Sequence, residues 1–106
     1  MFLRIFANCV EDEVSLLSSD IEAALVHFDP QPATPPKQYW KAPGLFEFTY
    51  RLSSPTRDIW NELVTDQPSG WHVLDNSDER SAVWNRGADH VFLVPAVRWA
   101  ELAGQA

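Results

Sequence analysis

The sequence predicts an α+β domain, in which a mainly antiparallel sheet carries two helices packed on one face, in the order β-α-β-α-β-β-β. Three observations predict this class. Apolar residues recur with helical spacing over 11–28, apolar and polar residues alternate over 44–52, and the last third contains short apolar runs separated by turn residues. Because the chain has 106 residues, we expect a single domain spanning 1–106.

Two segments have helical periodicity. The segment 11–28 places apolar residues three and four positions apart, and three acids in its first turn favour the positive end of the helix dipole. A second helix is predicted from Ser54 and Pro55, a capping residue and a first-turn proline, to Asp66. The predicted core faces are Val14, Leu17, Ile21, Leu25 and Phe28 in the first helix, and Ile59, Trp60, Leu63 and Val64 in the second.

Five further segments are predicted to be extended. Residues 1–7 form a first strand, and 44–52 form a half-buried strand with its aromatic residues inward and Glu47, Thr49 and Arg51 on the polar face. A meander follows over 71–74, 81–85 and 90–94, and the tail after Pro95 is a short helical turn or a final strand. The strand alternation implies a sheet with one covered and one exposed face.

Residues 30–43 contain five of the eight prolines. Proline lacks a backbone N–H and has a fixed φ, which excludes a helix or an inner strand here. We predict a long, extended and partly exposed connection, in which Trp40 is the least buried of the five tryptophans.

Composition excludes several classes of function. Fifteen acids and eight bases give a formal charge of −7, which disfavours direct binding of nucleic acid. The single cysteine excludes an internal disulfide and a cysteine-based zinc cluster. The N-terminus lacks the basic start and long apolar core of a signal peptide, and no stretch approaches the roughly 20 apolar residues of a membrane span. We therefore expect a soluble, cytoplasmic protein without a membrane partner.

No catalytic motif is present. Cys9 lies where a following helix would lower its pKa, but its neighbours give no sign of activation. A pattern similar to a calcium loop begins at Asp75, but Arg80 occupies the position that requires glycine, which argues against calcium binding. We expect a non-enzymatic protein with no cofactor and no metal. The alternative is a small metal-binding or hydrolytic domain that uses Cys9, His72 and His90.

Residues 58–79 carry six acids and no base. Three of these acids are spaced four apart in the predicted second helix, where like charges destabilise the helix. This pattern predicts an electrostatic docking surface for a basic partner; the alternative is a solvated helix face. Trp40 or Trp71 would serve as an aromatic anchor. The predicted binding residues are Asp58, Glu62, Asp66, Trp71, Asp75, Asp78, Glu79 and Trp40.

The last third, SAVWNRGADHVFLVPAVRWAEL, contains Trp84 in one predicted strand and a "WAEL" turn that begins at Trp99. This build resembles the bacterial immunity proteins of contact-dependent growth inhibition and related polymorphic toxin systems. The resemblance implies a cytoplasmic monomer that neutralises one cognate toxin C-terminal domain, often a basic nuclease, in a 1:1 complex. A homodimeric adaptor that pairs through a sheet edge or through 31–43 is the remaining alternative.

Overall fold

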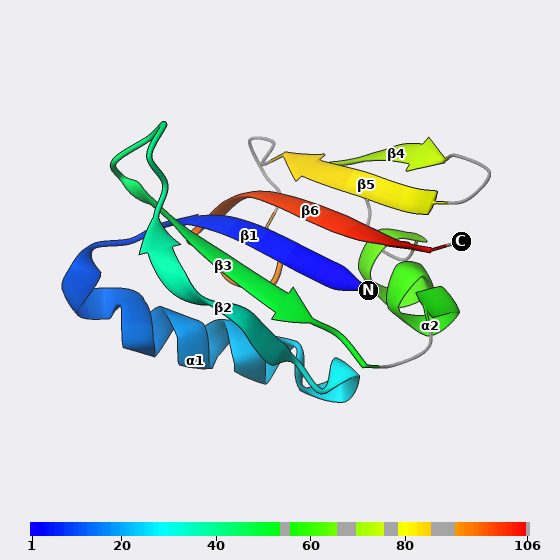
Figure 1. Cartoon of the computed structure of the whole chain (residues 1–106), viewed down its shortest axis with the longest axis horizontal. Coiled ribbons are helices and arrows are strands. Elements are labelled where there is room, and N and C mark those ends of the chain that lie inside the picture. Colours follow the sequence, from blue (N-terminus) through cyan, green and yellow to red (C-terminus); the bar gives the residue numbers. More distant parts are fainter. Residues whose placement is uncertain (54–55, 66–69, 76–78, 86–90, 106) are drawn as a thin grey trace.

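In the computed structural model, which describes residues 1–53, 56–65, 70–75, 79–85 and 91–105, six strands form one antiparallel sheet with helices on one face (Figure 1). The order across the sheet is β2-β3-β1-β6-β5-β4, and every neighbouring pair is antiparallel. The predicted α+β class is confirmed. The strands are β1 (Phe2–Asn8), β2 (Gln31–Gln38), β3 (Leu45–Arg51), β4 (Trp71–Asp75), β5 (Glu79–Asn85) and β6 (Val97–Gln105).

The first helical segment follows the predicted periodicity. A 3₁₀ turn, η1 (Glu11–Glu13), leads into α1 (Val14–Ala24), and a second 3₁₀ turn, η2 (Val26–Phe28), ends at Asp29 in the left-handed conformation. Of the predicted apolar face, the last three residues are fully buried, while Val14 and Leu17 pack partly against the core.

The second helical segment consists of α2 (Thr56–Trp60) and η3 (Asn61–Thr65), and η3 is a π-helix. Its four predicted core residues are all buried. Ser54, Pro55 and Asp66, with which we predicted the helix to begin and end, lie outside the described residues.

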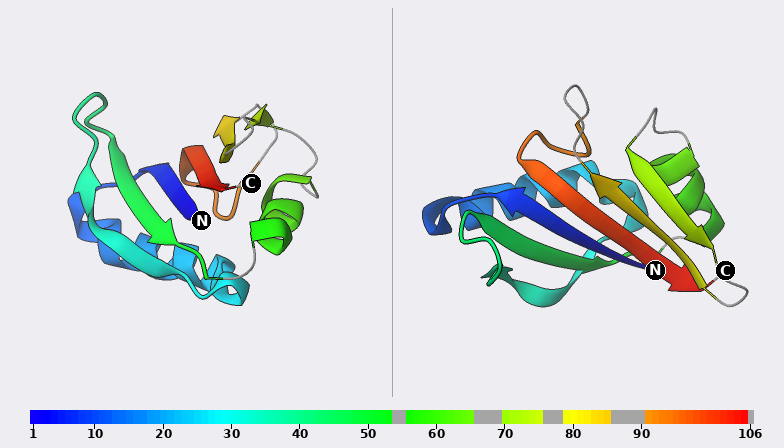
Figure 2. Two further views of the ribbon diagram at one scale, coloured as in Figure 1. Left: turned by 45° about the vertical axis from the view of Figure 1, so that its right-hand side comes forward. Right: turned by 90° about the horizontal axis from the view of Figure 1, so that it is seen from above.

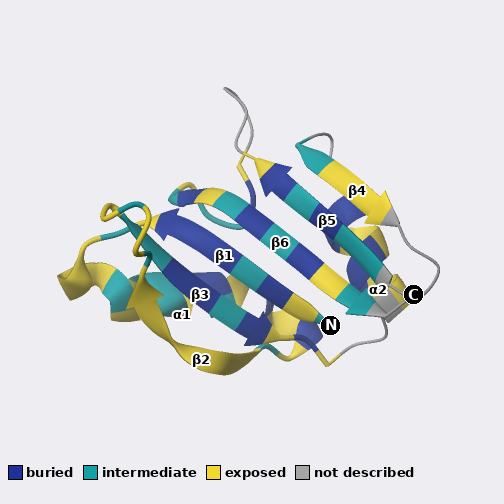
Figure 3. Cartoon of the chain, turned by 45° about the horizontal axis from the view of Figure 1, so that its top comes forward, coloured by how far each residue is buried: buried dark blue, intermediate teal, exposed yellow. Residues whose placement is uncertain are grey.

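The core lies between the sheet and the two helices. Figure 2 shows α1 along the β2–β3 side of the sheet and α2 along the β5–β4 side, and Figure 3 shows the alternation of buried and less buried positions along the strands. None of the described helices lies on the other face of the sheet, which we call the helix-free face. The strand residues buried against the helices include Leu3, Ile5, Phe48, Tyr50, Ala82, Trp84, Ala100 and Leu102.

The proline-rich segment differs from its prediction. It is extended and exposed, as expected, but Gln31–Gln38 is an edge strand, β2, paired with β3, rather than a connection. The register shifts between Pro32 and Thr34 and again between Thr34 and Lys37. Prolines are tolerated at an edge because their missing N–H groups are not needed by a second neighbour.

The end of the meander also differs. Residues 91–94 form only an isolated bridge between Phe92 and Val94, and Leu93 has a positive φ of 63°. The Phe92 ring is buried instead against Trp71 and Trp84. The prediction of a strand over 90–94 is therefore wrong for residues 91–94, the part of this segment that the structure describes. The second interpretation of the tail, a final strand, is confirmed by β6, which pairs with both β1 and β5.

Candidate functional site

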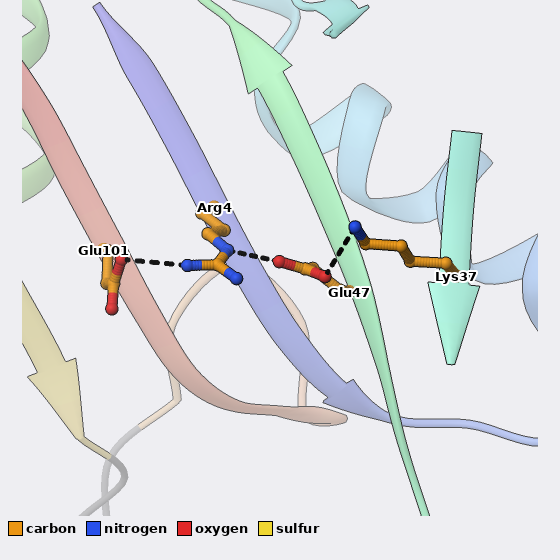
Figure 4. A network of polar contacts seen from close by, with 4 residues as sticks. All are labelled: Arg4, Lys37, Glu47 and Glu101. Carbon is orange, nitrogen blue, oxygen red and sulfur yellow. Dashed lines mark hydrogen bonds and ion pairs between the residues drawn. The ribbon is translucent and has the colours of Figure 1, made fainter. Parts of the chain in front are cut away.

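The helix-free face of the sheet carries a row of alternating charges across four strands (Figure 4). Arg4 of β1 lies at the centre: its Nε donates to Oε1 of Glu47 on β3, and its Nη1 lies 3.6 Å from Oε2 of Glu101 on β6. Lys37 of β2 places its Nζ 3.6 Å from the other oxygen, Oε2, of Glu47. We call Lys37, Glu47, Arg4 and Glu101 the sheet-face row.

Glu47 is more buried than the sequence predicts, because the alternation over 44–52 indicates an exposed polar face. It lies on the helix-free face as predicted, but it is only 5% exposed because Arg4 and Lys37 flank its carboxylate. The signal for this pair was the alternation itself, which puts Arg4 and Glu47 on polar faces. The pairing of β1 with β3, needed to bring them together, is not visible in either segment alone. Each carboxylate of the row is neutralised within the chain, so we interpret the row as structural.

An aromatic cluster covers the end of this face next to the β2–β3 turn. Phe6 stacks on Trp99 with ring centroids 4.4 Å apart, and Tyr39 approaches Phe6 edge-on at 4.8 Å. Trp40, next in the chain, is 81% exposed, and its ring lies 5.0 Å from Nζ of Lys41. The prediction that Trp40 is exposed is confirmed.

The helix side of the molecule is acidic. Asp58 on α2 and Glu62 on η3 are both exposed, as is Asp20 on α1, and none of the three has an ion pair with another described residue. Glu11–Glu13 form the turn that opens the first helical segment, which confirms their predicted place at a helix N-terminus. Two bases lie on this side as well: Arg57 is on α2, and the Arg80 guanidinium lies 5.1 Å from the centroid of the Trp60 ring.

The structure describes only part of the predicted acidic stripe. Because η3 is a π-helix, its turn is wider than the α-helical spacing from which the stripe was predicted. Asp66 and Asp78 lie outside the described residues. The backbone positions of Asp75 and Glu79 stand at the same end of the β4–β5 pair, where Asp75 is opposite Arg80.

The two predicted aromatic anchors lie at opposite ends of the sheet. Trp71 is half-buried on β4, edge-on to Phe92 at 5.2 Å, and its buried indole N–H has no hydrogen-bond partner among the described residues. Trp40 follows β2 at the far end of the strand order. The structure therefore does not bring Trp40 together with the carboxylates of α2 and η3.

The alternative catalytic residues are not assembled in the described part of the chain. Burial, followed by the charge of Glu13, raises the pKa of the Cys9 thiol, so the following helix does not lower this pKa below its ordinary value. His72 lies on β4, three strands from β1, which corresponds to roughly 14 Å. The described lining of the hollow beside Cys9 contains no histidine, and the described residues form no group of three or more metal-ligating side chains. His90 lies outside the described residues.

Among the described residues, Tyr50 has the pKa that its surroundings shift most. Its side chain packs in the core beneath α1, where burial and then the charge of Glu22 raise its pKa to about 12 despite a hydrogen bond with Ser18. A phenol that stays protonated in this position is a structural group of the core rather than an acid or base available to a ligand.

Comparison of the chain with models of protein families, with curated protein sequences and with solved structures gave no match. None of the described helices has the length and apolar character needed to cross a membrane.

Proposed function

We propose that the protein is an immunity protein that binds and neutralises a cognate toxin domain, one toxin per chain, and that the toxin is a basic nuclease. The observation that carries the proposal is the acidic helix side of the molecule, where Asp58 and Glu62 are exposed and form no ion pair with another described residue. The protein acts in the cytoplasm, where such a toxin would reach its substrate.

The fold supports this function by holding the carboxylates on a rigid base. Ile59, Trp60, Leu63 and Val64 anchor the second helical segment in the core, so the backbone that carries Asp58 and Glu62 is fixed before a partner arrives. A preorganised surface loses less conformational entropy on binding than a flexible one.

The electrostatics suit a nuclease as the target. A nuclease cleft must be positive to hold phosphates. An acidic surface is attracted by the same field, which speeds its encounter with the cleft and lets it compete with the substrate. Trp71, half-buried at the start of β4, would supply the apolar contact that slows dissociation.

The direct test is to sequence the reading frames next to this gene and to co-express this protein with any toxin-like domain that they encode. We expect the intact protein to restore growth and to form a stable complex with that domain. Growth arrest in the presence of folded protein would refute the proposal.

The surface is tested by association kinetics at low salt. The double variant Asp58→Lys and Glu62→Lys should slow association by roughly ten-fold or more, with a smaller effect at high salt. The matched control, Asp12→Lys and Glu13→Lys, makes the same change of net charge in η1, whose acids we assign to the helix dipole. Equal rates for the two double variants would remove Asp58 and Glu62 from the interface.

A further inference from the structure

The two edges of the sheet differ in how they are protected against further strand pairing. On β2, Pro32, Pro35 and Pro36 remove backbone donors. On β4 there is neither proline nor lysine, and its Val73 and Leu74 are 48% and 60% exposed. No described strand lies beyond β4 in the sheet (Figure 3).

The hydrogen-bond pattern shows which groups of β4 face outward. The N–H of Asn85 donates to the carbonyl oxygen of Gly70 at 3.1 Å, which fixes the phase of the β4–β5 ladder. In an antiparallel ladder bonded and non-bonded positions alternate, so His72 and Leu74 direct their backbone groups toward β5. The N–H and C=O groups of Trp71, Val73 and Asp75 therefore point away from the sheet.

We propose that β4 pairs with β4 of a second copy of this chain, antiparallel and centred on Val73, to form a symmetric dimer. In this register Val73 lies opposite Val73 of the second copy, His72 opposite Leu74, and Trp71 opposite Asp75. The outward backbone groups of one copy then meet the outward groups of the other. The exposed Val73 side chain lies beside its counterpart, and the exposed Leu74 side chain lies beside His72 of the second copy. Self-complementarity of this kind is what a two-fold interface requires.

The β2 edge of the sheet determines that the assembly stops at two copies. If both edges could pair, β2 of one copy would add to β4 of the next and an open filament would grow. The prolines of β2 block that contact, so only the β4–β4 pairing remains. The proposed dimer does not depend on the proposed function, and it differs from the monomer that the resemblance implies.

Net charge opposes the dimer without preventing it. Two copies of charge −7 repel each other at a distance, so added salt should strengthen dimerisation. The proposed register places the two Asp75 backbone positions four residues apart along the strand axis, roughly 13 Å. Like charges are therefore not opposed directly. Salt thus acts on the dimer in the opposite direction from its effect on toxin association.

Sedimentation equilibrium of the purified protein tests the dimer. We expect a mass that rises with concentration toward twice that of one chain, more strongly at high salt. Leu74→Lys should remain monomeric, whereas Leu16→Lys, a matched change of an exposed leucine on α1, should behave as the unmodified chain. A single-chain mass at every concentration would overturn the proposal, and so would equal dimerisation of the two variants.

Cysteine cross-linking tests the register. In a Cys9→Ser background, Val73→Cys places two cysteines opposite each other with Cα atoms about 5.5 Å apart, within disulfide range. The control His72→Cys faces Leu74 and lies roughly 8 Å from its own copy, outside that range. We expect oxidation to produce a covalent dimer from the first variant only. Equal cross-linking of both, or none in the first, would overturn the β4–β4 register.

Discussion

The replacement Arg4→Met removes the central charge of the sheet-face row while it keeps an unbranched side chain of similar length. Glu47, which is buried, would then keep only Lys37, whose Nζ lies 3.6 Å away on an exposed side chain. Its carboxylate would remain in a site where water reaches it poorly. We therefore expect the variant to be less stable than the original chain.

The size of the effect follows from the burial of the two partners. Removing one partner of a fully buried ion pair costs about 3–5 kcal/mol, because the remaining charge is uncompensated. The Arg4 side chain is 43% exposed, so solvent screens part of the interaction. We expect a loss of about 2 kcal/mol in the free energy of unfolding, or a fall of roughly 8–16 °C in Tm for a domain of this size.

Urea and thermal unfolding followed by circular dichroism measure this loss. The control is Arg51→Met on the same face, where the exposed guanidinium lies over the Phe2 ring and has no described ion pair; we expect a loss of about 0.5 kcal/mol. The double variant Arg4→Met with Glu47→Gln should be more stable than Arg4→Met alone, because the buried charge is gone. Equal losses for Arg4→Met and Arg51→Met would refute the interpretation of the row.

Three further predictions concern single positions. Gly70→Ala should lower the free energy of unfolding by about 2 kcal/mol or more, because Gly70 has φ +103° and an added Cβ would lie 2.5 Å from Nε1 of buried Trp84. The control is Gly44→Ala, whose added Cβ meets open space. It should change the free energy of unfolding by less than about 0.5 kcal/mol in the same urea titration. The pKa of the Tyr50 phenol is about 12 in the folded chain against 10 in the unfolded chain, so this group stabilises the fold below pH 10 and the stabilisation is lost between pH 10 and 12. Over that range Tyr50→Phe should lose less free energy of unfolding than the unmodified chain. Identical profiles of stability against pH would contradict the raised pKa of Tyr50. Cys9, with its raised pKa, should react with iodoacetamide more slowly than free cysteine at pH 8, as followed by mass spectrometry, and a faster reaction would contradict the structure.

Local patterns in the sequence determined the elements whose conformation depends on their own side chains. The spacing of Ile21, Leu25 and Phe28 predicted the buried face of the first helical segment, and the alternation in 44–52 predicted β3 with Phe48 and Tyr50 inward. In both cases one face must be buried, and the period of the apolar residues states which one. The mainly antiparallel α+β class followed from the order of these elements.

The tertiary structure decided which strands pair and what their pairing covers. Residues 97–105 contain two alanines and a glycine, which have weak strand preference, yet β6 is central because small Ala100 and buried Leu102 fit between β1 and β5. β2 is a strand because β3 offers a free edge, despite its prolines. The burial of Glu47 and the difference between the two sheet edges have the same cause. Neighbouring strands come from distant parts of the chain, so no local pattern in the sequence indicates which strands pair.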